Sequence, residues 1–168
     1  QTAYYECYRE WAAAKIHFGK YARDAAVPLA RKILKIARKY EITELIVDVC
    51  HTLRLYHGTI EGDHKKFQQY NKDFKRYEEI WKQENRAEEY YIEQSIGFIN
   101  SKATKTEFQE KARSYYEQVR EAMEKYDSYY LHLCGRLIEI SIYTSVNDYE
   151  NTLDVCDRGI AFFEKKPF

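Results

Sequence analysis

The stretch AVPLARKILKIARKY, residues 26–40, decides the fold of this 168-residue chain. Its apolar positions follow one another at steps of 4, 3, 4 and 3 residues, which keeps them on one face of a helix: Ala26, Ala30, Ile33, Ala37 and Tyr40. The same pattern returns every 41 residues, starting at Phe67, Phe108 and Tyr149. Of the 20 positions in these four rows, 18 are apolar or aromatic, whereas the overall hydrophobic content of 45% would give about nine by chance. A helical stripe repeated four times at a fixed period predicts a stacked helical-repeat array.

Each repeat is predicted to hold two antiparallel helices, so the expected fold is all-α, with about eight helices and a period of about 41–42 residues. The four hairpins span about residues 1–41, 42–83, 84–126 and 127–168. The expected first helices are Tyr4–Phe18, Thr43–His57, Asn85–Asn100 and Ser128–Thr144. The expected second helices are Asp24–Tyr40, Asp63–Gln83, Lys105–Tyr126 and Asp148–Lys165.

Residues that favour helix ends stand near several of these boundaries. The expected N-caps are Asp63, Thr104 or Thr106, and Asn147, because a short side-chain oxygen can accept a hydrogen bond from an unpaired helix N–H. Pro167 is expected to end the last helix because it cannot donate a backbone hydrogen bond.

The boundary between the second and third hairpins is less clear. No Gly or Pro occurs between Asp63 and Ile96, so one continuous helix is an alternative there. We expect a break near Gln83–Arg86, because the repeat requires one and the apolar stripe is interrupted by polar residues. We predict a single helical-repeat domain over residues 1–168, and a segment of a longer protein because the sequence begins at Gln1 without Met.

The charge balance argues against nucleic acid and membranes as partners. The chain has 27 basic and 27 acidic residues, whereas binders of duplex nucleic acid usually carry a basic surplus. No stretch approaches the ~20 apolar residues that a membrane span needs, and no basic start followed by an apolar run marks a signal peptide. Four cysteines without CxxC spacing are typical of buried, reduced thiols. We therefore predict a cytoplasmic protein that binds neither nucleic acid nor membrane.

The sequence shows no signature of catalysis or of cofactor binding. None of the five histidines has the spacing of a zinc pair, and we expect solvated or partner-facing imidazoles. Gly-rich phosphate loops and nucleophile elbows do not occur. The many carboxylates suit solvated helix faces. We expect no catalytic residue, no cofactor and no metal; a helical enzyme would need a clustered polar site that this sequence does not show.

Aromatic residues carry the strongest functional signal, with 17 Tyr, eight Phe and two Trp. Most lie on the helical stripes and are expected in the core. Neighbours on a helix point about 100° apart, so the two members of a doublet cannot both face inward. The doublets are Tyr4-Tyr5, Tyr90-Tyr91, Tyr115-Tyr116 and Tyr129-Tyr130. An exposed tyrosine from each pair would suit a protein interface, although scattered surface aromatics remain an alternative.

Several residues of the last hairpin carry a resemblance to a known family. Leu133-Cys134 and Leu137 precede the segment Tyr149–Ile160, YENTLDVCDRGI, and the closing Pro167. These residues resemble the tetratricopeptide repeat, in which a Leu-Gly pair and an aromatic mark the first helix and small residues mark the second. Val49-Cys50 and Leu53 stand in the same relation in the second hairpin. The period of that family is usually 34 residues, so the helices here would be longer.

The resemblance implies a right-handed α-solenoid whose concave face, lined by the first helices, holds a peptide or a partner helix. We therefore predict a protein-interaction scaffold or adaptor. The residues expected to bind the partner are Tyr8, His51, Arg54, Tyr90, Tyr91, His132, Arg136 and Glu139, with Glu93 and Gln94 as further polar candidates on the same helices. No terminal hairpin has a polar outer face, so self-association through the solenoid ends is also expected. The alternative is a ligand- or peptide-sensing regulatory domain that controls an effector domain outside this segment.

Overall fold

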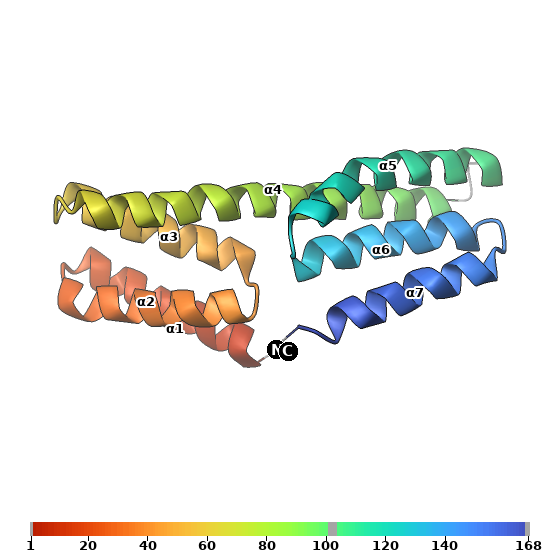
Figure 1. The fold of residues 1–168 in the computed structure, drawn as a ribbon. Coiled ribbons are helices and arrows are strands. Elements are labelled where there is room, and N and C mark those ends of the chain that lie inside the picture. The colour runs from red at the N-terminus through yellow and green to blue at the C-terminus, as the bar shows by residue number, and fades with distance from the viewer. Residues whose placement is uncertain (1, 101–103, 167–168) are drawn as a thin grey trace. The chain divides into compact units, whose positions relative to one another are not determined.

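The computed structural model describes residues 2–100 and 104–166, and every regular element among them is an α-helix (Figure 1). The seven helices are α1 (Thr2–Gly19), α2 (Arg23–Lys39), α3 (Thr43–Thr59), α4 (His64–Ile99), α5 (Lys105–Lys125), α6 (Tyr129–Thr144) and α7 (Tyr149–Phe163). The all-α prediction is confirmed, and helices that follow one another in sequence pack together as in a helical repeat. Seven helices stand in place of about eight because α4 combines two of the expected ones.

The break expected near Gln83–Arg86 does not occur, and α4 is one helix of 36 residues. Gln, Glu and Arg are good helix formers, so the residues that interrupt the apolar stripe do not interrupt the backbone. Glu84 is buried and accepts a hydrogen bond of 2.5 Å from the hydroxyl of Ser128. The polar residues at this point therefore serve packing inside a helix and do not mark its end.

Three helix–helix turns share one backbone geometry that no residue type in the sequence indicates. Tyr21, Glu41 and Asn147 have φ values of 60°, 49° and 60°, in the left-handed region that usually favours Gly. In each turn the next residue donates its N–H to a carbonyl five positions back, at 2.9–3.0 Å: Ala22 to His17, Ile42 to Ala37 and Asp148 to Tyr143. This hydrogen bond is the one that closes a Schellman motif. The repeated turn explains how short connections reverse the chain without glycine.

The helix N-termini agree in part with the predicted caps. Thr104 caps α5 in a complete capping box with Glu107, and Asp63 Oδ1 accepts the N–H of Lys66 at 3.0 Å. Asn147 is not the cap of α7, because it occupies the left-handed turn position; the side chain of Asp148 accepts the N–H of Asn151 instead. The predicted stop at Pro167 lies outside the described residues.

The chain divides after Trp81 into two compact units. Unit 1 contains α1, α2, α3 and the first part of α4. Its core is a continuous apolar cluster that includes Ala30, Ile33 and Ala37 of the first row, as predicted, with the α3 residues Ile46, Val49 and Leu53. Ala26 of the same row is also buried, and Tyr40 is partly buried against the cluster. Burial of this kind contributes about 1.5–3 kcal/mol for each large side chain.

Unit 2 contains α4 from Lys82 onward, α5, α6 and α7. Its apolar cluster includes Val119 of α5 with Leu131 and Ile138 of α6. The fourth row of the repeat, expected to pack inward, is exposed on α7 at Tyr149, Leu153 and Ile160, because α7 contacts its neighbours through other positions. Val155 and Gly159 are the buried residues of α7.

Candidate functional site

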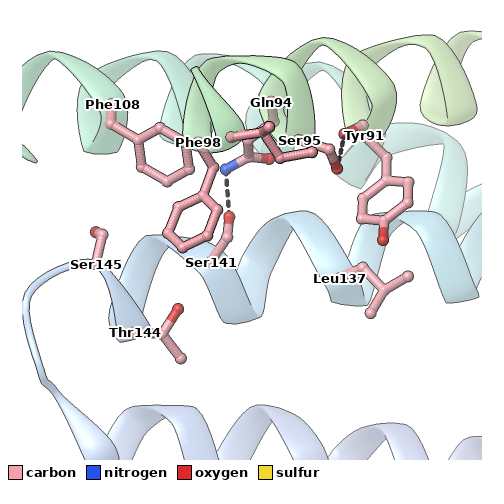
Figure 2. A pocket seen from close by; sticks show the side chains of 10 residues that line it. Tyr91, Gln94, Ser95, Phe98, Phe108, Leu137, Ser141, Thr144 and Ser145 are labelled. Atoms are coloured by element: carbon pink, nitrogen blue, oxygen red, sulfur yellow. Dashed lines mark hydrogen bonds between the residues drawn. The ribbon is translucent and has the colours of Figure 1, made fainter. Parts of the chain in front are cut away.

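A pocket of about 600 Å³ lies in unit 2, between the C-terminal parts of α4 and α6 and against the start of α5 (Figure 2). Its lining residues come from the expected first helices, apart from one aromatic ring of α5 and one residue just after α6. They are Tyr91, Gln94, Ser95, Phe98, Ile99, Phe108, Leu137, Ser141, Thr144 and Ser145. Pockets of this volume are typical of sites that bind organic ligands or side chains.

The helices around the pocket are aligned by polar contacts. Pairs between α4 and α6 advance in the same direction along both helices, so these helices run parallel: Glu84 with Ser128, Glu88 with Tyr130, and Gln94 with Ser141. Pairs between α4 and α5 run in opposite directions, so these two helices are antiparallel: Tyr90 with Gln118, and Glu93 with Tyr115. Tyr115 also stacks on Tyr90, with ring centroids 4.4 Å apart.

Residue size creates the space between α4 and α6. The α6 side presents small hydroxyl side chains, Ser141 and Thr144, with Ser145 just beyond the helix end. The α4 side presents the large rings of Tyr91 and Phe98. These two residues are two helical turns apart and therefore lie on the same face of α4. Because Tyr91 and Phe98 are exposed, their rings do not fill the space beside the small α6 side chains, and a pocket remains.

The pocket has an apolar rim that is open to solvent. Phe98 and Ile99 are 73% and 76% exposed, and the ring of Phe98 lies 6.1 Å from that of Phe108. Ile92 and Ile96 are also exposed on the same part of α4. Contiguous apolar side chains around a pocket are typical of surfaces that bind a partner.

Gln94 is the buried polar group of the pocket, with only 6% of its surface exposed. Its amide orientation follows from its neighbour: the Ser141 hydroxyl donates to the Ile138 carbonyl at 2.6 Å, so Ser141 Oγ can only accept from Gln94 Nε2. Gln94 Oε1 is then the buried atom of that amide that no described residue hydrogen-bonds. A buried acceptor without a donor costs about 1–3 kcal/mol.

Two predicted partner-binding residues in unit 1 lie partly inside its packing. Tyr8 packs against the apolar cluster, and burial raises the pKa of its hydroxyl. Arg54 donates to Asn71 Oδ1 at 3.0 Å, and its guanidinium lies 3.6 Å from the centroid of the Phe74 ring. His51 is exposed, with its ring 5.8 Å from that of Phe74.

Of the predicted residues in unit 2, Tyr91 lines the pocket, whereas Tyr90 faces α5. The buried Glu139 forms an ion pair with the partly buried Arg136 at 2.6 Å, and Arg158 joins it at 3.0 Å. The pocket residues that the prediction omitted include Phe98, Ser141 and Thr144, whose proximity depends on the register of α4 against α6 and is not marked by any local sequence signal. The assignment of all eight residues to partner binding stays a prediction.

His132 and His57 are buried, which corrects the expectation of solvated or partner-facing imidazoles. His132 Nε2 donates to the carbonyls of Met123 and Tyr126 at 3.0 and 3.2 Å, and its ring stacks on Phe162 with centroids 3.9 Å apart. Burial lowers the pKa of His132, and its Nδ1 contacts no acceptor among the described residues. This histidine ties the α5–α6 turn to α7 and is structural.

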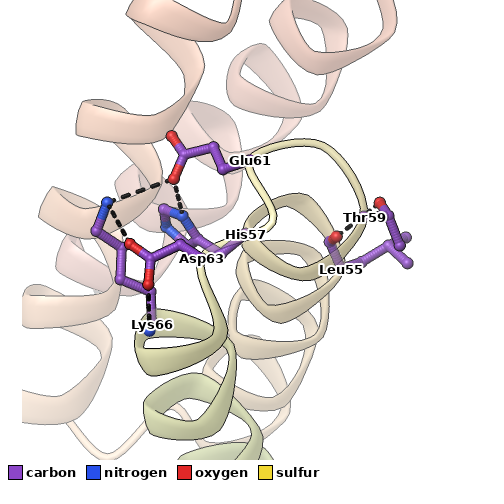
Figure 3. A network of polar contacts seen from close by, with 6 residues as sticks. All are labelled: Leu55, His57, Thr59, Glu61, Asp63 and Lys66. Atoms are coloured by element: carbon purple, nitrogen blue, oxygen red, sulfur yellow. Dashed lines mark hydrogen bonds and ion pairs between the residues drawn. The ribbon is translucent and has the colours of Figure 1, made fainter.

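His57 is fully buried in unit 1, where it forms a second polar cluster (Figure 3). Its Nδ1 donates to Glu61 Oε2 at 2.6 Å, and its ring stacks on Tyr70 with centroids 5.3 Å apart. Lys66 contacts Glu61 and Asp63 at 3.3 and 3.2 Å. These contacts fix the turn into α4, and the hydrogen bond from His57 lowers the pKa of Glu61.

The cysteines are free thiols, and Cys7, Cys50 and Cys134 are buried. Burial raises the pKa of Cys50 to about 12 and that of Cys134 to about 11, so both stay protonated near neutral pH. Within residues 2–100 and 104–166, no three His, Cys, Asp or Glu side chains gather as metal ligands would.

Comparisons with known proteins identify no relative of this chain. In the described part of the chain, no helix has the length and apolar character required to cross a membrane. The chain matches no protein-family model, no curated protein and no solved structure.

Proposed function

We propose that this chain is a cytoplasmic protein-interaction module, a tetratricopeptide-like right-handed α-solenoid that binds a peptide or a partner helix. The observation that carries the proposal is the pocket between α4 and α6 with its exposed apolar rim at Phe98 and Ile99. An apolar side chain of a partner would fill the pocket while the rim contacts the neighbouring residues. Anchoring of this kind supplies most of the binding free energy in many interfaces.

The direction of α4 and α6 supports this mode of binding. Both belong to the expected first helices, and they run parallel with the pocket between them. A peptide laid across two parallel helices can place side chains between them while its backbone stays at the surface. The proposed binding residues are therefore Tyr91, Gln94, Phe98 and Leu137, with Phe108 closing one side.

A ligand-sensing regulatory domain is the second candidate. The pocket volume of about 600 Å³ would also accommodate a small organic molecule. In that case binding would change the packing of α4 against α6 and so signal to an effector domain outside this segment. Self-association through the ends of the solenoid stays a prediction, which a concentration series in sedimentation velocity would test.

The proposal is tested by selecting random peptides on phage against the chain and measuring their affinity by fluorescence anisotropy. Thr144→Phe places a ring at the pocket, because Thr144 lines it and is exposed. Thr59→Phe is the matched control: each threonine is the last residue of its helix, is exposed, and donates to the carbonyl four residues back.

We expect selected peptides to share an aromatic or aliphatic residue at one position. Their affinity should fall at least about tenfold in Thr144→Phe and stay unchanged in Thr59→Phe, because only the first substitution occupies the pocket. Peptides that bind Thr144→Phe as tightly as the wild type would place the binding surface elsewhere, and a selection without any enriched sequence would contradict a peptide-binding role.

A further inference from the structure

The serine and threonine hydroxyl groups of the pocket have committed their protons to the backbone. Three of these four hydroxyls donate to carbonyls three or four residues back, and the fourth, Ser141, donates to Ile138 as described above. The three pairs are Ser95 to Tyr91 at 2.8 Å, Thr144 to Ile140 at 3.0 Å, and Ser145 to Ile142 at 2.8 Å. Because each hydroxyl has a single proton, these oxygens can offer a ligand only their lone pairs. The Tyr91 hydroxyl alone can rotate to donate or accept.

Gln94 Oε1 extends this set of acceptors to the most buried polar group of the pocket. The contact of Gln94 Nε2 with Ser141 fixes which end of the amide is left over, and that end is a carbonyl oxygen. Satisfying it requires an N–H or O–H donor from whatever enters the pocket. The residues that line the pocket thus carry acceptors on both α4 and α6.

The C-termini of α4 and α6 also favour a hydrogen-bond donor in the pocket. α4 ends at Ile99 and α6 ends at Thr144, and both residues line the pocket. The C-terminus of a helix carries a partial negative charge from its last carbonyl groups, which favours the positive end of a donor group. Two such ends beside one pocket make it electronegative without a formal charge.

Formal charge is absent from the lining, which consists of neutral residues only among those the structure describes. An ammonium or carboxylate in the pocket would lose its hydration without gaining an opposite charge, which is costly. A neutral donor pays a much smaller desolvation cost. The rings of Tyr91, Phe98 and Phe108 provide flat apolar walls for the body that carries this donor.

We infer that the pocket selects an aromatic side chain bearing a neutral hydrogen-bond donor, first of all the indole of a tryptophan in the bound peptide, with its N–H donating to Gln94 Oε1. This inference rests on the proposed function and specifies the residue that anchors the peptide. Tryptophan combines a large apolar surface with one donor and no acceptor, which matches a pocket of apolar walls and unpaired acceptors.

The test uses free indole and 1-methylindole as probes, titrated into the isotope-labelled whole chain and followed by NMR shifts of the pocket residues. The two probes differ by one methyl group that removes the donor. If the pocket recognised only apolar surface, 1-methylindole would bind about fourfold tighter than indole, because it buries an extra methyl group. We expect the opposite order, with indole about three- to tenfold tighter, because the methylated probe leaves Gln94 Oε1 without a donor.

Gln94→Met removes the acceptor and nearly keeps the side-chain length, so the order of the two probes should reverse in this variant. Gln69→Met is the control, because Gln69 is exposed on the part of α4 that belongs to unit 1. Comparing the affinities of the two probes for the wild-type chain requires no substitution, so the test holds even if a variant perturbs folding.

The inference is overturned if 1-methylindole binds the wild type as tightly as indole, if neither probe shifts the pocket resonances, or if the cation phenethylammonium binds tighter than indole. Failure of the proposed function would look different. In that case the preference for indole would persist while peptide selection enriches no sequence, whereas peptides sensitive to Thr144→Phe but indifferent to an indole N–H would overturn this inference alone.

Discussion

Unit 1 and unit 2 bury their polar groups in different places. In unit 1, the buried polar residues among those described are Thr43 and His57, which stand at or near the ends of α3. In unit 2, three buried polar residues stand within helices, Glu84, Gln94 and Glu139, and two more, Ser128 and His132, stand at or near the start of α6. Apolar burial is not directional, whereas hydrogen bonds fix distances and register. The unit that contains the pocket is thus also the one in which buried polar residues within the helices help to hold those helices in place.

The largest expected change in stability comes from substituting two carboxylates that differ in burial. Each of them accepts hydrogen bonds from two side chains. Glu139 of α6 is 4% exposed and accepts from Arg136 and Arg158. Asp48 of α3 is partly exposed and accepts from Trp11 and Lys15. We expect Glu139→Gln to lower the free energy of unfolding by about 2 kcal/mol, because it buries a neutral amide between Arg136 and Arg158 and leaves the partly buried Arg136 without an opposite charge.

Asp48→Asn serves as the matched variant in unit 1 and should cost less than about 1 kcal/mol, because solvent screens a partly exposed ion pair. Urea unfolding followed by circular dichroism measures both. If the two substitutions cost the same, the polar contacts of unit 2 would matter no more than those of unit 1, and the comparison would fail.

A smaller, pH-dependent effect is expected from His132. Burial, with a further contribution from Arg136, lowers its pKa below the ordinary value of 6.5, although the Tyr126 and Met123 carbonyls and Asp127 act in the other direction. Below pH 6.5 the unfolded chain therefore binds a proton that folded His132 still excludes. The stability from this group is complete above pH 6.5 and is lost as the pH falls through the lowered pKa.

We expect His132→Gln to reduce the loss of stability between pH 7.5 and pH 5, measured by urea unfolding at each pH. The slope with pH is the informative quantity, because the substitution also removes the stacking on Phe162. His51→Gln is the control, since His51 is exposed. Equal slopes in His132→Gln and in the wild type would show that His132 does not contribute to the pH dependence of stability.

Much of the fold was predictable because helical periodicity is a local property of the sequence. The apolar rows that begin at Ala26 and Phe108 lie largely buried in α2 and α5, as the spacing predicts. The continuity of α4 was not predictable from the stripe, because Glu84 is polar and yet buried against Ser128, a residue 44 positions away. The turns were expected between the predicted helices, but the left-handed backbone of Tyr21 and Glu41 was not predicted, because this geometry usually selects glycine.

The candidate site was predictable only in outline. The first helices do line the pocket, and Tyr91 is among its residues. The pocket itself depends on Phe98 facing Ser141, two residues whose proximity follows from the register of α4 against α6 and not from local sequence. Tertiary packing also decides the environment of His132 and Glu139, which look like surface residues on a helix considered alone and are buried in the structure.

The smallest expected change in stability belongs to the residue with the largest expected role in binding. Gln94→Met removes one hydrogen bond to Ser141 and also removes the buried carbonyl that no described residue satisfies. The two effects oppose each other, so we expect the free energy of unfolding to stay within about 1 kcal/mol of the wild type or to rise. Urea unfolding of Gln94→Met beside Gln69→Met measures it. A clear loss of stability would mean that the Gln94 amide is fully used by the fold. In that case it would have no free acceptor for a ligand, and unit 2 would bury this group for the same structural reason as Glu139.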